Sequence, residues 1–156
     1  MKTGPSIDRA NSKQDYATPD DFFLAVRTRF GPMAWDLAAS EYNTKIAFYF
    51  NEEANSLIQQ WHTISPEYLW LNPPYSNIRP WAKKCLDESE QGAKILFLVP
   101  AAVGSNWFAE FVHRKAVVLF LSPRLCFDGK NPYPKDCMLV VWNKIIQPEY
   151  QIWRWK

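Results

Sequence analysis

The stretch Leu69-Trp70-Leu71-Asn72-Pro73-Pro74-Tyr75 holds the side chains with the clearest chemical potential in this chain of 156 residues. Three apolar residues suited to a buried strand run directly into an amide, two prolines and a tyrosine. Pro73 and Pro74 each fix φ and lack a backbone donor, and each restricts the residue before it to extended conformations. The chain therefore leaves the strand as a stiff corner that presents hydrogen-bond acceptors and one aromatic ring. Ligands of α/β folds bind at the carboxyl ends of strands, which makes this corner a candidate active site.

Asn72-Pro73-Pro74-Tyr75 resembles the catalytic tetrapeptide of the S-adenosylmethionine-dependent amino-methyltransferases. The wider layout is similar to that of the phage-encoded DNA N-6-adenine-methyltransferase family, over about residues 14–143. In chain order, its parts here are Tyr16-Ala17-Thr18-Pro19, Trp35-Asp36-Leu37-Ala38-Ala39, the tetrapeptide with Trp81 after it, Leu98-Val99-Pro100-Ala101, Trp107-Phe108 and Arg124-Leu125-x-Phe127. A rigid turn without chemistry is the alternative interpretation of the tetrapeptide, because proline-rich turns are common. The ordered companions favour the enzyme.

The resemblance implies that a methyl group is transferred from S-adenosylmethionine to the exocyclic N6 of adenine in DNA. This amine is a poor nucleophile, because its lone pair is delocalised into the ring. The Asn72 side-chain oxygen and the Pro73 carbonyl, held rigidly by Pro74, are placed to accept its hydrogens and to stabilise the positive charge that grows on nitrogen. Tyr75 is suited to stack on a base that has left the duplex. Methylation of RNA or of protein glutamine, and a catalytically silent nucleic-acid-binding domain, stay open as alternatives.

The resemblance also implies contacts with the cofactor at an early turn and after the first strand. The residues concerned are Tyr16, Thr18, Pro19, Asp36, Ala38 and Ala39. Glu52 is a further candidate, because doubly wound enzymes often hold a ribose with an acid that follows the second strand. Each site has a structural alternative: Thr18 fits a helix cap, Asp36 fits a cap for the next turn, and Glu52 fits a solvated acid. The chain departs from the usual pattern, since no glycine lies between Gly31 and Gly92, and Ala38 stands where the phage family has a cysteine.

A long loop at residues 122–136, rich in proline and charge, is our candidate for contact with nucleic acid. The residues predicted to make this contact are Arg124, Phe127, Lys130, Tyr133 and Lys135. The net charge of the whole chain is only +2, so any DNA contact has to come from a local patch of this kind.

Strands alternate with helices along most of the chain, which predicts a single-domain, three-layer α/β sandwich of the Rossmann-like methyltransferase type. We expect helices at about 18–30, 76–91 and 106–114, and strands at about 33–37, 46–50, 67–71, 93–99 and 116–121, in a mostly parallel sheet. No crossover helix precedes 137–142, so this strand should be antiparallel, at the edge of the sheet, in a C-terminal hairpin. Residues 152–155 alternate like a last short strand. Residues 1–15 are predicted to be a flexible arm before a methyltransferase domain at 16–156.

The composition, 47% hydrophobic and 22% charged, is that of a globular protein. The three cysteines are widely spaced without a Cys-x-x-Cys pair, which favours reduced thiols over a disulfide framework or a zinc site. His62 and His113 lie in unrelated contexts, so we expect no bound metal. We found neither a signal peptide nor an apolar run of membrane-spanning length, and therefore expect a cytoplasmic monomer or homodimer, in a bacterial host cell if the protein is phage-encoded.

Overall fold

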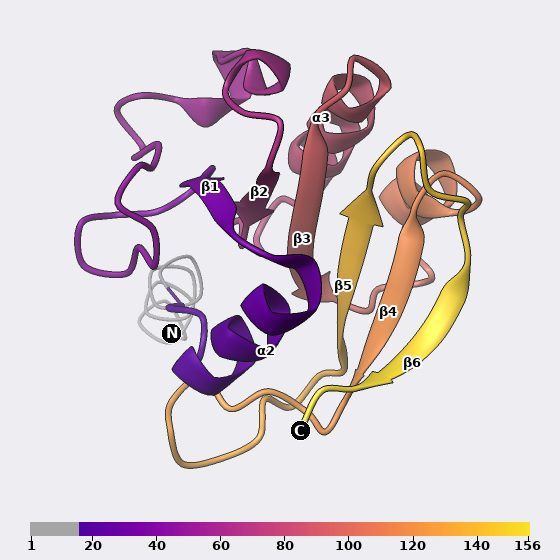
Figure 1. The fold of residues 1–156 in the computed structure, drawn as a ribbon. Coiled ribbons are helices and arrows are strands. Elements are labelled where there is room, and N and C mark those ends of the chain that lie inside the picture. The colour runs from indigo at the N-terminus through magenta and orange to yellow at the C-terminus, as the bar shows by residue number, and fades with distance from the viewer. Residues whose placement is uncertain (1–15) are drawn as a thin grey trace, which may run out of the picture.

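A computed structural model describes residues 16–156, which form one six-stranded sheet with helices on both faces (Figure 1). The strand order is β1-β2-β3-β5-β4-β6. The strands span Met33–Asp36 (β1), Tyr68–Leu71 (β2), Lys94–Pro100 (β3), Val117–Ser122 (β4), Cys137–Trp142 (β5) and Tyr150–Arg154 (β6). β5 runs antiparallel to both of its neighbours, and every other pairing is parallel. The predicted arm at residues 1–15 lies outside the described residues.

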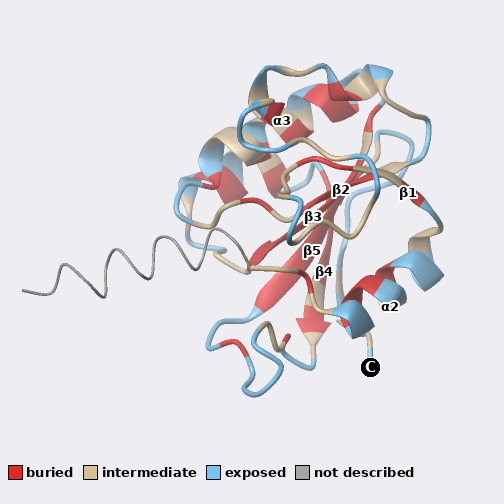
Figure 2. Ribbon diagram, turned by 90° about the vertical axis from the view of Figure 1, so that its left-hand side faces the viewer, coloured by how far each residue is buried: buried red, intermediate tan, exposed pale blue. Residues whose placement is uncertain are grey.

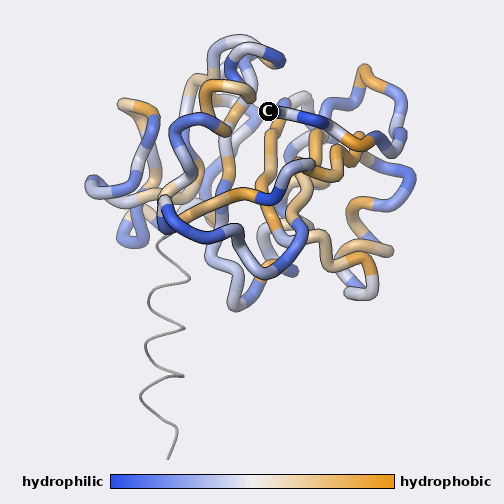
Figure 3. Tube along the Cα trace, turned by 90° about the horizontal axis from the view of Figure 1, so that it is seen from below, coloured by the Kyte–Doolittle hydropathy of each residue, from blue (hydrophilic) through white to orange (hydrophobic). Residues whose placement is uncertain are grey.

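Alternate residues of the central strands feed two separate hydrophobic cores. In β3, Ile95 and Phe97 belong to the core beneath α3 (Arg79–Glu90), whereas Leu96 belongs to the core beneath α2 (Asp20–Phe30). Successive side chains of a strand point to opposite faces, so a strand covered on both sides reads as a continuous apolar run. Figure 2 shows these strands buried between the two helical layers, and in Figure 3 hydrophobic stretches run through the middle of the trace. The predicted three-layer α/β architecture is confirmed.

The predicted antiparallel strand exists, but its predicted place at the edge was wrong. β5 lies between β3 and β4, and all six of its residues are buried. An apolar strand without a polar face is more stable inside the sheet, where both ladders and both faces are covered. The hairpin is formed by β4 and β5. The final strand, β6, takes the edge beside β4 and alternates exposed and half-covered residues.

The strand expected at residues 46–50 is reduced to a single bridge between Asp36 and Tyr49. Two backbone hydrogen bonds link this stretch to Asp36, one to the Phe48 carbonyl and one from the Phe50 amide, each 2.9 Å long. The rings of Trp35 and Phe48 stack 5.2 Å apart. The segment at 46–50 is therefore held against β1 by ring packing and two backbone hydrogen bonds, and not by a continuous β-ladder.

The helices begin and end close to their predicted bounds, with different caps. Pro19, not Thr18, is the N-cap of α2, and Ile78 is the N-cap of α3, with no capping hydrogen bond from a side chain at either helix. The chain leaves α3 through Gly92, whose φ of +110° favours glycine. The predicted helix at 106–114 contains a π-helical segment, η3 (Phe108–Val112), and two short 3₁₀ turns, η1 (Ser56–Ile58) and η2 (Trp61–Thr63), precede β2. None of the helices in residues 16–156 is long and apolar enough to cross a membrane.

Candidate active site

The Asn72 side chain is held at both ends, directly after the last residue of β2. Its Nδ2 donates to the Tyr16 carbonyl oxygen at 3.2 Å and to the Thr18 hydroxyl at 3.3 Å. Its Oδ1 accepts a hydrogen bond of 2.8 Å from the Tyr75 hydroxyl. Both amide hydrogens therefore have acceptors within the protein, and the carbonyl oxygen keeps one lone pair for a further donor.

The turn at residues 16–19 thus reaches the proline corner across more than fifty residues of chain. Thr18 is only 4% exposed, and its hydroxyl serves Asn72 instead of capping α2. A buried hydroxyl without a hydrogen-bond partner lowers the stability of the folded protein, so the bond to Asn72 satisfies a group that would otherwise be unpaired. The sequence brought these two motifs together only through the family resemblance.

Burial also fixes the state of the Tyr75 hydroxyl. It raises the pKa of Tyr75 well above the usual range, and the neighbouring Cys137, Tyr133 and Tyr16 act in the same direction. The hydroxyl therefore stays protonated and keeps donating to Asn72. A tyrosine that locks the asparagine carbonyl was not predicted, since the sequence indicated only a stacking ring.

A cleft of about 1030 Å³ opens beside Asn72. Residues from four parts of the chain line it. They are Tyr16 in the early turn, residues 37–40 and 43 after β1, residues 50–53, 55 and 56 before β2, and Asn72, Pro74 and Trp81 after β2. Of the predicted cofactor residues, Tyr16, Ala38, Ala39 and Glu52 line the cleft. The chain segments that meet here are far apart in sequence, as expected where α/β folds bind ligands.

Asp36 lies behind the cleft surface and does not line it. The residue is 3% exposed, and its Oδ1 accepts a hydrogen bond from the Ala38 amide at 3.3 Å. Burial raises the pKa of its carboxyl to about 7, although the amides of Ala38 and Lys45 act in the opposite direction. The carboxyl thus ties together both ends of the loop that carries Ala38 and Ala39, which is the structural alternative that the sequence left open. Thr18 and Pro19 likewise do not line the cleft.

Trp81, which follows the tetrapeptide in the family layout, lines the cleft. It is also a packing residue, because its ring stacks on the buried Trp61, with 6.4 Å between the ring centroids. The spacing places a side chain on the inner face of a helix but does not show where that face ends. Asn55 and Ser56, which also line the cleft, carried no signal in the sequence.

The aromatic residues of the loop at 123–136 pack on the turn that holds Asn72. Phe127 stacks on Tyr16 at 5.1 Å, and Tyr133 meets both rings edge-on at 5.2 and 6.0 Å. Tyr133 is 6% exposed, so its ring packs inside the protein, and its predicted contact with nucleic acid stays a prediction. Arg124 is exposed and paired with Asp136 at 2.8 Å.

Two further cations of this loop, Lys130 and Lys135, are exposed. The loop also carries Asp128 and Asp136, so three positive and two negative side chains leave it a net charge of +1. Within residues 16–156, no cluster of three or more His, Cys, Asp or Glu side chains could hold a metal ion. The cysteines Cys85, Cys126 and Cys137 are free.

The sequence of this chain is similar to those of DNA adenine methyltransferases. The model of the family described as DNA N-6-adenine-methyltransferase (Dam) matches residues 6–153. A DNA N-6-adenine-methyltransferase of Escherichia phage T1 is 30% identical over 122 residues, which cover 78% of this chain and 50% of the phage protein. One from Haemophilus phage HP1 (strain HP1c1) is 32% identical over 94 residues, covering 59% of this chain and 53% of that protein. The chain spans about half the length of these relatives.

Proposed function

Because the chain belongs to the DNA N-6-adenine-methyltransferase (Dam) family, we propose that it transfers a methyl group from S-adenosylmethionine to the N6 of adenine in DNA. One observation carries the proposal: the Asn72 carbonyl oxygen is held at a cleft by three hydrogen bonds to its amide group. A side chain fixed in this way is preorganised to accept a hydrogen from an amine. A proline turn that served only to reverse the chain would not need these contacts.

The cleft suits the cofactor in size and in chemistry. Its volume of about 1030 Å³ is at the upper end of the range for sites that bind small molecules, roughly 300–1,000 Å³. The small side chains of Ala38 and Ala39 leave its surface open, and Glu52 offers a carboxylate that can accept hydrogen bonds from ribose hydroxyls. Tyr16 and Trp81 add aromatic surface. When bound, S-adenosylmethionine supplies an electrophilic methyl group on a positively charged sulfur.

The proline corner prepares the attacking amine. Asn72 Oδ1, through its second lone pair, and the Pro73 carbonyl accept the two N6 hydrogens, which orients the nitrogen and stabilises the positive charge that it acquires. The nitrogen would form a bond to the methyl carbon as the bond from this carbon to the sulfonium sulfur breaks. The bond electrons stay on sulfur, S-adenosylhomocysteine leaves as a neutral thioether, and the nitrogen gives up one proton to water in the open cleft. Tyr75 stacks on the extruded base and offsets part of the cost of removing it from the helix.

DNA is proposed to approach along the loop at 123–136. The exposed Arg124, Lys130 and Lys135 can contact phosphates, and such contacts position a duplex without reading its sequence. Phe127 is half-buried against Tyr16, so it could meet a base only together with that residue. The loop therefore connects the DNA to the turn that holds Asn72.

The test is a transfer assay with S-adenosylmethionine that carries a labelled methyl group. We expect label in adenine-containing DNA, recovered as N6-methyladenine by mass spectrometry of nucleosides, and none in DNA without adenine. Parallel reactions with RNA and with a glutamine-containing peptide test the other methyl acceptors. Binding of S-adenosylhomocysteine with no transfer to any of these acceptors would contradict the proposal and favour a silent binding domain.

A further inference from the structure

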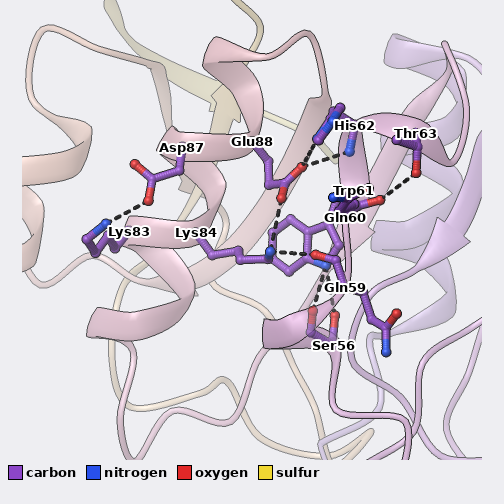
Figure 4. A network of polar contacts seen from close by, with 10 residues as sticks. All are labelled: Ser56, Gln59, Gln60, Trp61, His62, Thr63, Lys83, Lys84, Asp87 and Glu88. Atoms are coloured by element: carbon purple, nitrogen blue, oxygen red, sulfur yellow. Dashed lines mark hydrogen bonds and ion pairs between the residues drawn. The ribbon is translucent and has the colours of Figure 1, made fainter.

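A buried carboxylate on α3 accepts hydrogen bonds from His62, which lies between the cleft and β2, and from Lys84 on the same helix. Glu88 is 5% exposed, and its Oε1 accepts hydrogen bonds from the His62 amide at 2.8 Å and from His62 Nδ1 at 2.6 Å (Figure 4). Burial alone would raise the pKa of Glu88, but the hydrogen bonds from His62 and Lys84 outweigh it and hold the pKa below its ordinary value. Charges are rarely buried so completely unless they are paired.

Lys84 links this carboxylate to the chain that precedes His62. Its ammonium group donates to Glu88 Oε2 at 3.0 Å and to the Gln59 carbonyl oxygen, and it lies over the Trp61 ring, 5.3 Å from the centroid. The ammonium group therefore has three partners, and two of them belong to the segment between the cleft and β2. Figure 4 shows the lysine in the middle of this network.

From Trp61 and Gln59, hydrogen bonds connect this network to residues 52–56, the part of the cleft lining that we call the wall. Trp61 Nε1 donates to the Ser56 carbonyl at 3.0 Å and to the Ser56 hydroxyl at 3.1 Å, and Ser56 lines the cleft. The Gln59 side-chain amide donates to the Ala54 carbonyl at 2.7 Å, directly after the lining residue Glu53. These hydrogen bonds, with the contact of Lys84 on the Trp61 ring, therefore connect Glu88 to Ala54 and Ser56.

This wall has little structure of its own to hold it. Residues 51–67 contain two short 3₁₀ turns, η1 and η2, and neither an α-helix nor a strand. Asn55 has a φ of 51°, in the left-handed region, which asparagine adopts more readily than most residues other than glycine. A segment of this kind fluctuates unless side chains from a rigid element fix it, and a site that is ordered in advance binds its ligand more tightly.

We propose that Glu88 is a positioning residue that holds the wall at residues 52–56 in its ligand-ready form. The inference rests on the proposed function for the identity of the ligand, S-adenosylmethionine or its product. Glu88 does not line the cleft, so it acts through Lys84, Trp61 and the 3₁₀ turns. Its effect falls on cofactor affinity and not on the methyl-transfer step.

The same helix provides a matched control. Lys83 and Asp87 form a pair with the same spacing as Lys84 and Glu88, one residue earlier, at 2.7 Å. Their side chains are 60% and 53% exposed, against 18% and 7% for the buried pair. In Figure 4, no hydrogen bond or ion pair joins Lys83 or Asp87 to the other residues drawn. The variants Glu88→Gln and Asp87→Asn therefore each remove one negative charge from the same helix. Only Glu88→Gln changes a residue of the network.

The experiment compares these two variants with the wild-type protein in two measurements. Hydrogen–deuterium exchange of the free protein should show faster exchange of residues 52–63 in Glu88→Gln, with β3 unchanged, and wild-type behaviour in Asp87→Asn. Calorimetry with S-adenosylhomocysteine should show an affinity about 3- to 30-fold weaker in Glu88→Gln and within about twofold of wild type in Asp87→Asn. In turnover, KM for S-adenosylmethionine should rise while kcat changes little.

Failures of the inference and of the proposed function are distinguishable. Equal exchange at residues 52–63 in Glu88→Gln and Asp87→Asn overturns the inference, whatever the ligand does. A wild-type protein that does not bind S-adenosylhomocysteine overturns the proposed function. Lys84→Met, which keeps the side-chain stem over Trp61, is the second variant. If Glu88→Gln unfolds globally, a Lys84→Met protein with a wild-type exchange pattern at 52–63 overturns the inference too.

Discussion

The Asn72 corner and the wall at residues 52–56 line one cleft, yet they are held in different ways. The corner is stiff by its own covalent structure, because two prolines follow the asparagine, and three hydrogen bonds between uncharged groups complete it. The wall has no such local stiffness and is tied to α3 through a buried carboxylate and an ammonium group. We infer that the two regions have different functions: the corner prepares the amine for methyl transfer, and the wall binds the cofactor.

The largest effect should come from Asn72→Ala, which removes the oxygen that accepts the amine hydrogen. We expect kcat to fall by about 10²–10³-fold, as for the loss of one fixed group that stabilises charge in the transition state. Affinity for S-adenosylhomocysteine should change by less than about threefold. The control is Asn77→Ala, an exposed asparagine five residues later. An Asn72→Ala enzyme with weak cofactor binding and normal kcat would reverse the proposed division.

Glu52→Gln should affect binding alone. Losing a charge-assisted hydrogen bond costs about 1.5–3 kcal/mol, so the Kd for S-adenosylhomocysteine should rise about 10- to 100-fold with kcat nearly unchanged. Glu53→Gln is the matched control, since Glu53 is also exposed and lines the same cleft. Calorimetry of both variants decides which acid holds the ribose. The opposite ranking would transfer the role to Glu53, and no loss in either variant would remove the acids from the site.

A smaller effect is expected for Tyr75→Phe, which keeps the ring and removes the hydroxyl that donates to Asn72. Loss of one hydrogen bond of about 1 kcal/mol should lower kcat about fivefold. Tyr75→Ala also removes the stacking surface, worth about 1–3 kcal/mol per base, and should lose considerably more activity. Steady-state kinetics of both variants separate the hydroxyl from the ring. Equal losses would show that the hydroxyl, not stacking, accounts for the whole contribution of Tyr75.

Asp36→Asn should change the pH dependence of stability more than activity. Burial raises the pKa of this carboxyl from 3.8 to about 7, so the folded protein binds more protons than the unfolded chain between these values. Its contribution to the free energy of unfolding therefore falls as pH rises from about 4 to 7, by on the order of 2–4 kcal/mol.

Urea unfolding at pH 5 and pH 8 measures this change. The Asn variant should lose less stability between the two values than wild type, and the exposed Asp87→Asn should behave like wild type. The contrary result is a wild-type protein whose free energy of unfolding rises from pH 5 to pH 8, with no such rise in Asp36→Asn. It would mean that the surroundings of Asp36 favour the charged carboxylate and lower its pKa.

The sequence predicted the parts of the molecule that depend on local rules. The corner, the apolar strands and the amphipathic helices follow from neighbouring residues, and the family resemblance supplied the early turn at 16–19. What failed depends on contacts between distant residues. Nothing near β5 shows that it inserts between β3 and β4, and nothing near Glu88 shows that its partner is His62, twenty-six residues away. The packing of Tyr133 on Tyr16 was missed for the same reason.

The most direct measurement is a crystal structure of the protein with S-adenosylhomocysteine and an adenine-containing oligonucleotide. The account predicts an extruded adenine beside Tyr75, with its N6 within about 3.2 Å of both Asn72 Oδ1 and the Pro73 carbonyl oxygen. The Tyr16 and Thr18 contacts to Asn72 should be retained. An adenine seated in the cleft with its N6 turned away from both oxygens, or an Asn72 side chain rotated out to bind DNA, would contradict it.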